Sequence, residues 1–188
     1  MADHTLTVPE AAFVTGHSVR GVNDEIDSGI VASRGRPTRR IGRTDLLYLA
    51  AIRDLRTHLG RVLRQRLRDT IAAAHAAKQR TARIGHLTIG LDAVEADIAD
   101  RLRMLDRLRG EAIEERLDIL GGEPVLRGTR IPARHVAEMA RQGASTAELG
   151  QEFDLSPQQV EAAILYDQVS PRSGRPPRKA RRVVPAPR

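Results

Sequence analysis

Apolar residues recur at helical spacing along most of the chain, interrupted by glycine, proline and clusters of arginine. A short helix is expected at 8–14. Two more are expected to start at Ser18 and at Thr44, because each offers a side-chain oxygen that can cap a helix N-terminus. Their inward-facing residues would be Val19, Val22, Ile26, Leu46, Leu49, Ile52 and Leu55. Residues 30–41 hold glycine, proline and arginines, which predicts a hairpin-like wing between these helices.

The middle of the chain is predicted to form two long helices, at 61–78 and 92–117, with a short strand at 86–91. The second helix has an apolar stripe that steps by three and four: Leu91, Val94, Ile98, Leu102, Leu105, Leu108 and Ala112. Such a stripe is typical of two-helix packing. We interpret it as a dimerisation element centred on Ile98, Leu102, Leu105 and Leu108. The alternative is packing within one chain against the 61–78 helix.

The stretch from Gly121 to Tyr166 opens with Gly-Gly-Glu-Pro-Val-Leu-Arg-Gly-Thr-Arg-Ile-Pro. Two short β-prone segments, 125–126 and 129–131, flank Gly128, which can take a positive φ at little steric cost. Three short helices are then expected, the first from about 132 to 142. The other two begin at capping boxes, in which Ser145 pairs with Glu148 and Ser156 pairs with Gln159. This arrangement predicts a helix-turn-helix-like bundle.

The opening motif, the Gly143-Ala144-Ser145 turn and the run Leu155-Ser156-Pro157-Gln158-Gln159-Val160 resemble a small helical antitoxin family long catalogued as a domain of unknown function. The resemblance covers about a quarter of the chain. It implies a type II antitoxin of the VapB kind, encoded beside a PIN-like ribonuclease toxin. The alternative is a well-capped bundle that unrelated regulators also use.

Residues 7–56 resemble the winged helix-turn-helix of the MerR and excisionase group, in the order helix, glycine turn, helix, Gly-Ile-Val, basic wing, helix. The resemblance implies that the following side chains face the major groove of DNA: Ser18, Arg20 and Asn23. It implies that five arginines hold phosphates or enter the minor groove: Arg34, Arg36, Arg39, Arg40 and Arg43. Asp24, Glu25 and Asp27 depart from the group's basic or aromatic pattern, which shifts weight from base readout to the wing. The alternative for the arginines is a solvated loop.

Charge separates the end of the chain from the rest. The net charge is +7, and the seven cations after Ser170 account for all of it, because the other 24 basic residues match the 24 acidic ones. The helix at 157–166 carries no cation and is therefore a poor ligand for DNA. We expect the bundle to assemble or scaffold and the N-terminal unit to bind DNA.

The Pro- and Arg-rich tail, 169–188, has too few apolar residues to fold alone. PIN-like ribonucleases gather carboxylates around a divalent metal, so the resemblance implies that a tail arginine enters that acidic site. The candidates for toxin binding are Arg172, Arg175, Arg178, Lys179, Arg181 and Arg182. Which arginine enters is left open. The alternative is a solvated tail or one that touches DNA nonspecifically.

Composition favours no catalytic or metal site. The chain has no cysteine, its six histidines lack metal-ligand spacing, and no nucleophile elbow or phosphate loop is present. We expect no cofactor, no metal and no enzymatic activity. No apolar run approaches membrane-spanning length, so no membrane partner is expected and a cytoplasmic location is favoured.

These observations predict a mainly α protein in four parts: a winged helix-turn-helix DNA-binding domain (1–58), a helical connector and dimerisation region (59–117), the antitoxin bundle (118–168) and a basic toxin-binding tail (169–188). The predicted function is that of a dimeric antitoxin that represses its own operator, a double-stranded DNA site, and neutralises a PIN-like ribonuclease. The alternative is a stand-alone MerR-like dimeric regulator without a toxin.

Overall fold

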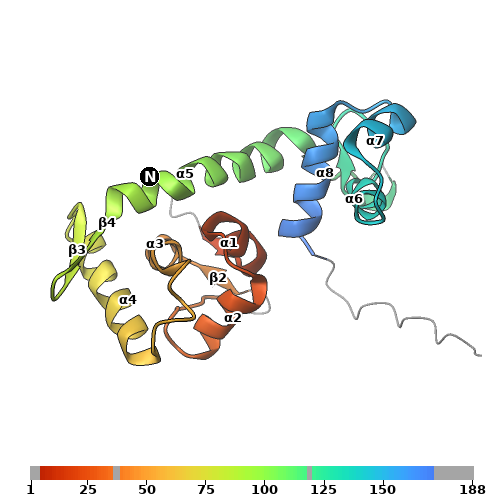
Figure 1. Ribbon diagram of the computed structural model, residues 1–188. Coiled ribbons are helices and arrows are strands. Elements are labelled where there is room, and N and C mark those ends of the chain that lie inside the picture. Colours follow the sequence, from red (N-terminus) through yellow and green to blue (C-terminus); the bar gives the residue numbers. More distant parts are fainter. Residues whose placement is uncertain (1–4, 36–38, 118–119, 172–188) are drawn as a thin grey trace, which may run out of the picture.

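The computed structural model describes residues 5–35, 39–117 and 120–171, and this part of the chain is mainly helical, as predicted. Three two-stranded antiparallel sheets accompany the helices (Figure 1). In chain order the elements are β1 (Leu6–Thr7), α1 (Val8–Thr15), α2 (Val19–Asp27), β2 (Arg40–Ile41), α3 (Arg43–Ile52), α4 (Arg61–Ala76), β3 (Thr81–Ile84), β4 (Leu87–Gly90), α5 (Leu91–Arg107), a π-helical turn (Leu108–Ala112), β5 (Ile113–Glu114), a 3₁₀ turn (Leu120–Gly122), β6 (Val125–Leu126), α6 (Ala133–Arg141), α7 (Thr146–Phe153) and α8 (Pro157–Val169).

The N-terminal unit is a helix-turn-helix closed by a small sheet. Ser18 caps α2 as predicted, its Oγ accepting from the backbone N–H of Gly21 at 3.0 Å. The predicted cap at Thr44 is wrong, because the residue at the N-cap of α3 is Gly42. The hydroxyl of Thr44 instead lies 3.3 Å from Nδ1 of His75 on α4, so tertiary contact takes the side chain away from the helix end.

Helical spacing located most of the inward faces but misplaced several positions at helix ends. Val22 of α2 is fully buried, whereas Val19 is 42% exposed, since it lies in the first turn beyond the neighbouring helices. Leu55 is 50% exposed because α3 has already ended at Ile52. On α4, Val62 is 84% exposed, and burial is confined to Leu67, Ile71 and Ala74.

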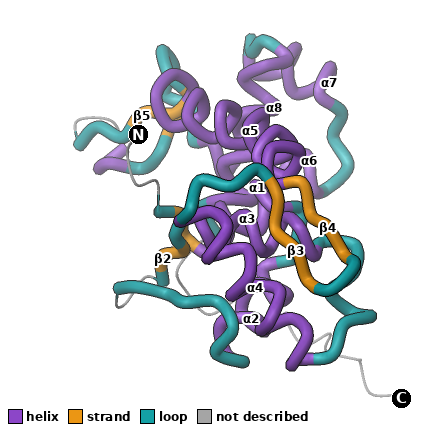
Figure 2. Tube along the Cα trace, turned by 90° about the vertical axis from the view of Figure 1, so that its left-hand side faces the viewer, coloured by secondary structure: helices purple, strands orange, loops and turns teal. Residues whose placement is uncertain are grey.

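The connector contains more strand than predicted. β4 confirms the expected short strand, but its partner β3 was not anticipated; together they form a hairpin beside α4 (Figure 2). The predicted helix at 92–117 is too long, because α5 ends at Arg107 and continues as the π-helical turn. Ile113 and Glu114 then form β5, which pairs with β6.

The C-terminal bundle follows the capping pattern. Both capping boxes form: Ser145 Oγ accepts from the N–H of Glu148, and Ser156 Oγ accepts from the N–H of Gln159. The two β-prone segments contact each other only in part. The N–H of Leu126 donates to the carbonyl of Ile131 at 3.0 Å, but the strand partner of β6 is β5, from before the motif.

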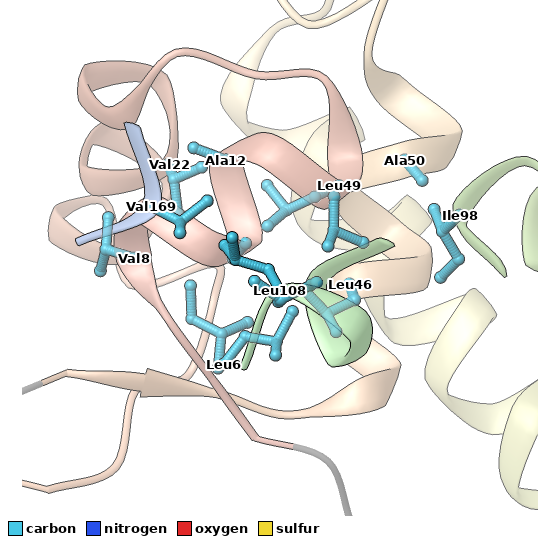
Figure 3. Packing of buried hydrophobic residues seen from close by; sticks show 14 of the residues in the cluster. Leu6, Val8, Ala12, Val22, Leu46, Leu49, Ala50, Ile98, Leu108 and Val169 are labelled. Atoms are coloured by element: carbon cyan, nitrogen blue, oxygen red, sulfur yellow. The ribbon is translucent and has the colours of Figure 1, made fainter. Parts of the chain in front are cut away.

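One apolar cluster runs through all of these parts. α5 lies across the N-terminal unit and leads to the bundle (Figure 1), packing against α1 and α3. Leu108 of the π-helical turn and Val169 of α8 enter the same cluster as Val8 and Leu46 (Figure 3). The bundle is therefore seated on the N-terminal unit.

This packing corrects the assignment of the dimer contacts. Ile98, Leu105 and Leu108 are 0–3% exposed within a single chain, and Leu102 is partly buried. The stripe is thus core, and its main partners are α1 and α3, not the 61–78 helix that was the alternative. Homodimerisation itself stays a prediction.

Candidate nucleic-acid interface

The side chain of His17 joins the turn between α1 and α2 to α3. Nε2 of His17 lies 2.8 Å from the carbonyl of Leu49, and burial lowers the pKa of His17, with a smaller lowering contribution from Arg56 and an opposing one from the hydrogen bond to Leu49. The neutral ring that burial favours donates through Nε2 to this carbonyl. The N-terminus of α2 is thereby held at the surface.

Arg20 is the predicted major-groove residue best placed to contact a ligand. Its side chain is exposed on the first turn of α2 and has no hydrogen bond or ion pair with the described residues. Ser18 uses its hydroxyl as the cap, and Asn23 donates to the carbonyl of Val19 at 3.1 Å.

Arg39 ties the wing to α2. Its Nη1 donates to Oδ1 of Asn23 at 3.1 Å and to Oδ1 of Asp27 at 2.9 Å. Two predicted DNA contacts, Arg39 and Asn23, therefore bind each other in the free protein. Because both side chains of the Arg39–Asp27 pair are exposed (44% and 63%), water screens the pair and a phosphate can compete for the guanidinium.

The arms of the wing meet at an antiparallel bridge between Arg34 and Arg40, which exchange backbone hydrogen bonds of 2.9 and 2.8 Å. Arg36 lies outside the described residues. Arg43, at the start of α3, pairs with Glu95 of α5 at 3.3 Å. Arg34, Arg40 and Arg43 line one cavity of about 700 Å³ behind the wing, to which α2 contributes no residue.

Glu25 does not have the role that its sequence position indicated. It was grouped with Asp24 and Asp27 as an acid weakening the DNA-binding face, but its side chain is fully buried. Tyr48 donates to its Oε2 at 3.0 Å, Arg64 pairs with its Oε1, and Arg56 lies 3.7 Å away. Burial and the adjacent Glu25 charge raise the pKa of Tyr48. This cluster joins α2 to α3 and α4 and sets the position of α2.

Sequence reasoning missed this cluster and a second internal pair. Asp45 is buried and accepts from Nε of Arg68 at 2.9 Å, which raises the pKa of that guanidinium. Arg64 and Arg68 belong to the arginines of the predicted 61–78 helix, to which no role was assigned from the sequence. No feature of the local sequence indicates that α3 packs beside these arginines.

Within the described ranges, Arg134 of the C-terminal bundle is bound by groups of its own chain, unlike Arg20 on α2. Arg134 of α6 donates to the carbonyl of Ser170 at 2.7 Å, lies over the Tyr166 ring at 5.4 Å and faces Asp167 at 3.7 Å. Burial, and then the charge of Glu115, raise the pKa of Tyr166. The guanidinium group of Arg134 therefore holds the end of α8 in place. The toxin-binding candidates that follow lie outside the described residues: Arg172, Arg175, Arg178, Lys179, Arg181 and Arg182.

Among the described residues no group of His, Cys, Asp and Glu is arranged to hold a metal ion. No helix in the same ranges is both long enough and apolar enough to cross a membrane.

Residues 113–166 match the family described as "Protein of unknown function (DUF433)". The matched segment begins at β5 and ends within α8, so it includes the strand pair and all three helices of the bundle. The chain is 29% identical over 192 residues to "Uncharacterized protein y4eO" of Sinorhizobium fredii (strain NBRC 101917 / NGR234), covering 90% of this chain and 83% of that protein.

Among solved structures, the crystal structure of Rv2018 from Mycobacterium tuberculosis aligns with 84% of this chain and 95% of that chain. The sequence identity is 14% and the TM-score is 0.35.

Proposed function

We propose that this protein is an antitoxin of a type II toxin–antitoxin system, which binds its own operator DNA through the N-terminal unit and neutralises a PIN-like ribonuclease. The observation that carries the DNA-binding part is the geometry of α2 and the wing. α2 projects an exposed Arg20, whose side chain has no partner among the described residues, beside an arginine-bearing loop, and α2 is held to α3 and α4 by hydrogen bonds and an ion pair.

Phosphate neutralisation supplies most of the affinity of such an interface. The candidate phosphate contacts are Arg34, Arg36, Arg39, Arg40 and Arg43. Releasing Arg39 from Asp27 on binding exchanges one exposed ion pair for another, so its cost is small. Base readout is limited to Ser18, Arg20 and Asn23.

The antitoxin part rests on the resemblance of the motif at 121–132, which lies inside the family-matched segment. α8 exposes Gln158 and Glu161 near its N-terminus, which does not suit a DNA backbone. We infer that the bundle presents the basic tail and does not bind DNA itself. A tail arginine then competes with metal and RNA phosphate for the carboxylates of the nuclease.

A stand-alone MerR-like regulator is the second candidate, favoured by the same N-terminal geometry. The neighbouring reading frame separates the two. A gene for a small PIN-like nuclease beside this one supports the antitoxin, and an isolated gene supports the regulator.

The direct test is co-expression with the neighbouring gene product, followed by co-purification and an RNA-cleavage assay with and without this chain. The full chain is expected to abolish cleavage, and a chain ending at Ser170 is expected to bind DNA normally but to inhibit poorly. Full inhibition by the truncated chain would contradict the role given to the tail.

A further inference from the structure

The cavity behind the wing has a chemical character of its own. It is bounded by the base of the wing, the N-terminus of α3, α4 and α5, and its volume of about 700 Å³ suits a small organic molecule. Among the described residues, five arginines line it against three carboxylates, so this part of the lining carries a net positive charge.

Two of the three carboxylates already form ion pairs with arginines of the lining. Glu95 pairs with Arg43 at 3.3 Å, and the buried Asp45 accepts from Arg68 at 2.9 Å. Arg34 has no side-chain partner among the described residues. Within the described ranges the Arg40 guanidinium reaches only the carbonyl of Thr5, at 3.5 Å, the outer limit of a hydrogen bond.

The register makes Arg34 and Arg40 direct cross-strand neighbours, since each donates its N–H to the carbonyl of the other. Residues opposite each other in an antiparallel pair project from the same face. Like charges placed opposite each other destabilise a strand pair unless an anion lies between them. The wing base is therefore relieved of repulsion when an anion binds there.

The N-terminus of α3 also favours the binding of an anion in this cavity. Gly42 has no side chain to cap the helix, and the hydroxyl of Thr44 is turned to His75. Both residues line the cavity, so the positive end of a ten-residue helix faces the space beside the two arginines.

We propose that this cavity is a binding site for a small phosphomonoester, whose phosphate group is held by Arg34 and Arg40 near the N-terminus of α3. Guanidinium groups bind a phosphate bidentately, and that geometry suits two arginines on one face. Asp106 is the third carboxylate in the lining and has no ion pair within the described residues. It accepts a hydrogen bond from a hydroxyl or amino group of the ligand and disfavours a second phosphate.

A DNA backbone phosphate shares this chemistry, so the source of the phosphate has to be separated. The site is lined by no residue of α2, which is consistent with a ligand that binds without a duplex. The proposal goes beyond the function given above, because it concerns a free small molecule and requires neither operator binding nor nuclease inhibition.

The experiment is a titration of the full chain with inorganic phosphate at constant ionic strength, followed by amide chemical shifts and by calorimetry. We expect saturable one-to-one binding, with shifts at Thr44 and Asp45. Arg34→Gln and Arg40→Gln should each weaken it about tenfold or more, as expected for removal of a charge-assisted hydrogen bond. Arg83→Gln, which removes an exposed arginine on β3, should leave the affinity unchanged.

A second arm uses a short DNA duplex without added phosphate. If free phosphate gives no saturable shift at the start of α3 while the duplex does, the site serves only the DNA backbone and the proposal fails. Equal phosphate affinity in the wild type and in both arginine variants would also overturn it. Circular dichroism of the variants establishes that they are folded.

Discussion

Glu25 is the residue on which the position of α2 depends most. Its carboxylate has 0% exposure and contacts Tyr48 and Arg64. Removing one partner of a buried ion pair leaves the other charge uncompensated, which costs far more than disruption of a surface pair. A buried acid in α2 is thus a structural requirement, although it reduces the positive charge of the unit.

We therefore expect Glu25→Ala to lower the free energy of unfolding by about 3 to 5 kcal/mol, measured by urea denaturation. The control Asp27→Ala removes only the exposed pair with Arg39 and should cost less than about 1 kcal/mol. Equal destabilisation of the two variants would mean that Glu25 is not the internal anchor.

His17 predicts a pH dependence whose sign follows from its environment. Burial lowers its pKa in the folded state below the ordinary value of 6.5, so the unfolded chain takes up protons first as the pH falls. The stabilisation is complete above that value and is lost as the pH falls from there through the lower folded-state pKa.

The measurement is the free energy of unfolding between about pH 7.5 and about pH 5, compared between wild type and His17→Gln. The variant should lose part of the decline with pH. His86→Gln, which removes an exposed histidine at the hairpin turn, should retain it. An identical decline in His17→Gln and wild type would show that the histidine is not buried in its neutral form.

At the scale of the elements, α5 belongs to the interior of one chain. Leu105 is 1% exposed, whereas its neighbour Met104 is 50% exposed on the outer face. A stripe at helical spacing identifies which face of a helix is covered, but it carries no information about whether the covering surface belongs to the same chain.

Leu105→Ala is accordingly expected to lower the free energy of unfolding by about 2 to 5 kcal/mol, as other large core truncations do. Met104→Ala should change it by no more than about 0.5 kcal/mol. The contrary result is a Leu105→Ala variant of unchanged stability that is monomeric in light scattering while the wild type is a dimer.

Local signals predicted the elements whose causes are local. Ser18, Ser145 and Ser156 cap helices through bonds within three residues, and all three caps form. β5 and β6 depend on pairing Ile113 with Leu126, thirteen residues apart along the chain, and neither strand is long enough to show an alternating pattern. Their pairing was therefore missed.

The same reasoning applies to the candidate site. The basic wing and the exposed Arg20 follow from composition and spacing, since arginines in a Gly/Pro loop have few apolar surfaces to cover. The bond from Arg39 to Asn23 and Asp27, the pair of Arg43 with Glu95 and the cavity behind the wing are tertiary. The side-chain contacts join residues 12 to 52 positions apart, where spacing has no predictive value.

At the scale of the whole molecule, the N-terminal unit and the family-matched bundle share one core. Arg109 of the π-helical turn pairs with the buried Glu10 of α1, and Arg101 of α5 donates to the carbonyl of Phe13 at 3.2 Å. Val169, in the last turn of α8, is buried in the same cluster as Val8 (Figure 3). The segment that precedes the basic tail is therefore fixed against the DNA-binding candidate, which favours one rigid support for both proposed activities.

The exposed arginines proposed to bind DNA and the internally bound Arg134 lie in different parts of the molecule. The exposed cations proposed to contact DNA lie on α2 and the wing, while Arg134 of the bundle is occupied by Ser170, Tyr166 and Asp167. If this division determines function, removal of charge from the two surfaces has unequal effects on DNA binding.

The most direct test is the salt dependence of affinity for the DNA upstream of the gene, measured by fluorescence anisotropy. The variant Arg20→Ala/Arg39→Ala/Arg40→Ala should bind more weakly, and the slope of log affinity against log salt should flatten by about 0.9 for each DNA phosphate that the variant no longer neutralises. A matched variant, Arg83→Ala/Arg130→Ala/Arg141→Ala, removes the same charge from the hairpin and bundle and should keep the wild-type slope. Equal flattening in both variants, or flattening in the matched variant alone, would contradict a DNA-binding surface on α2 and the wing.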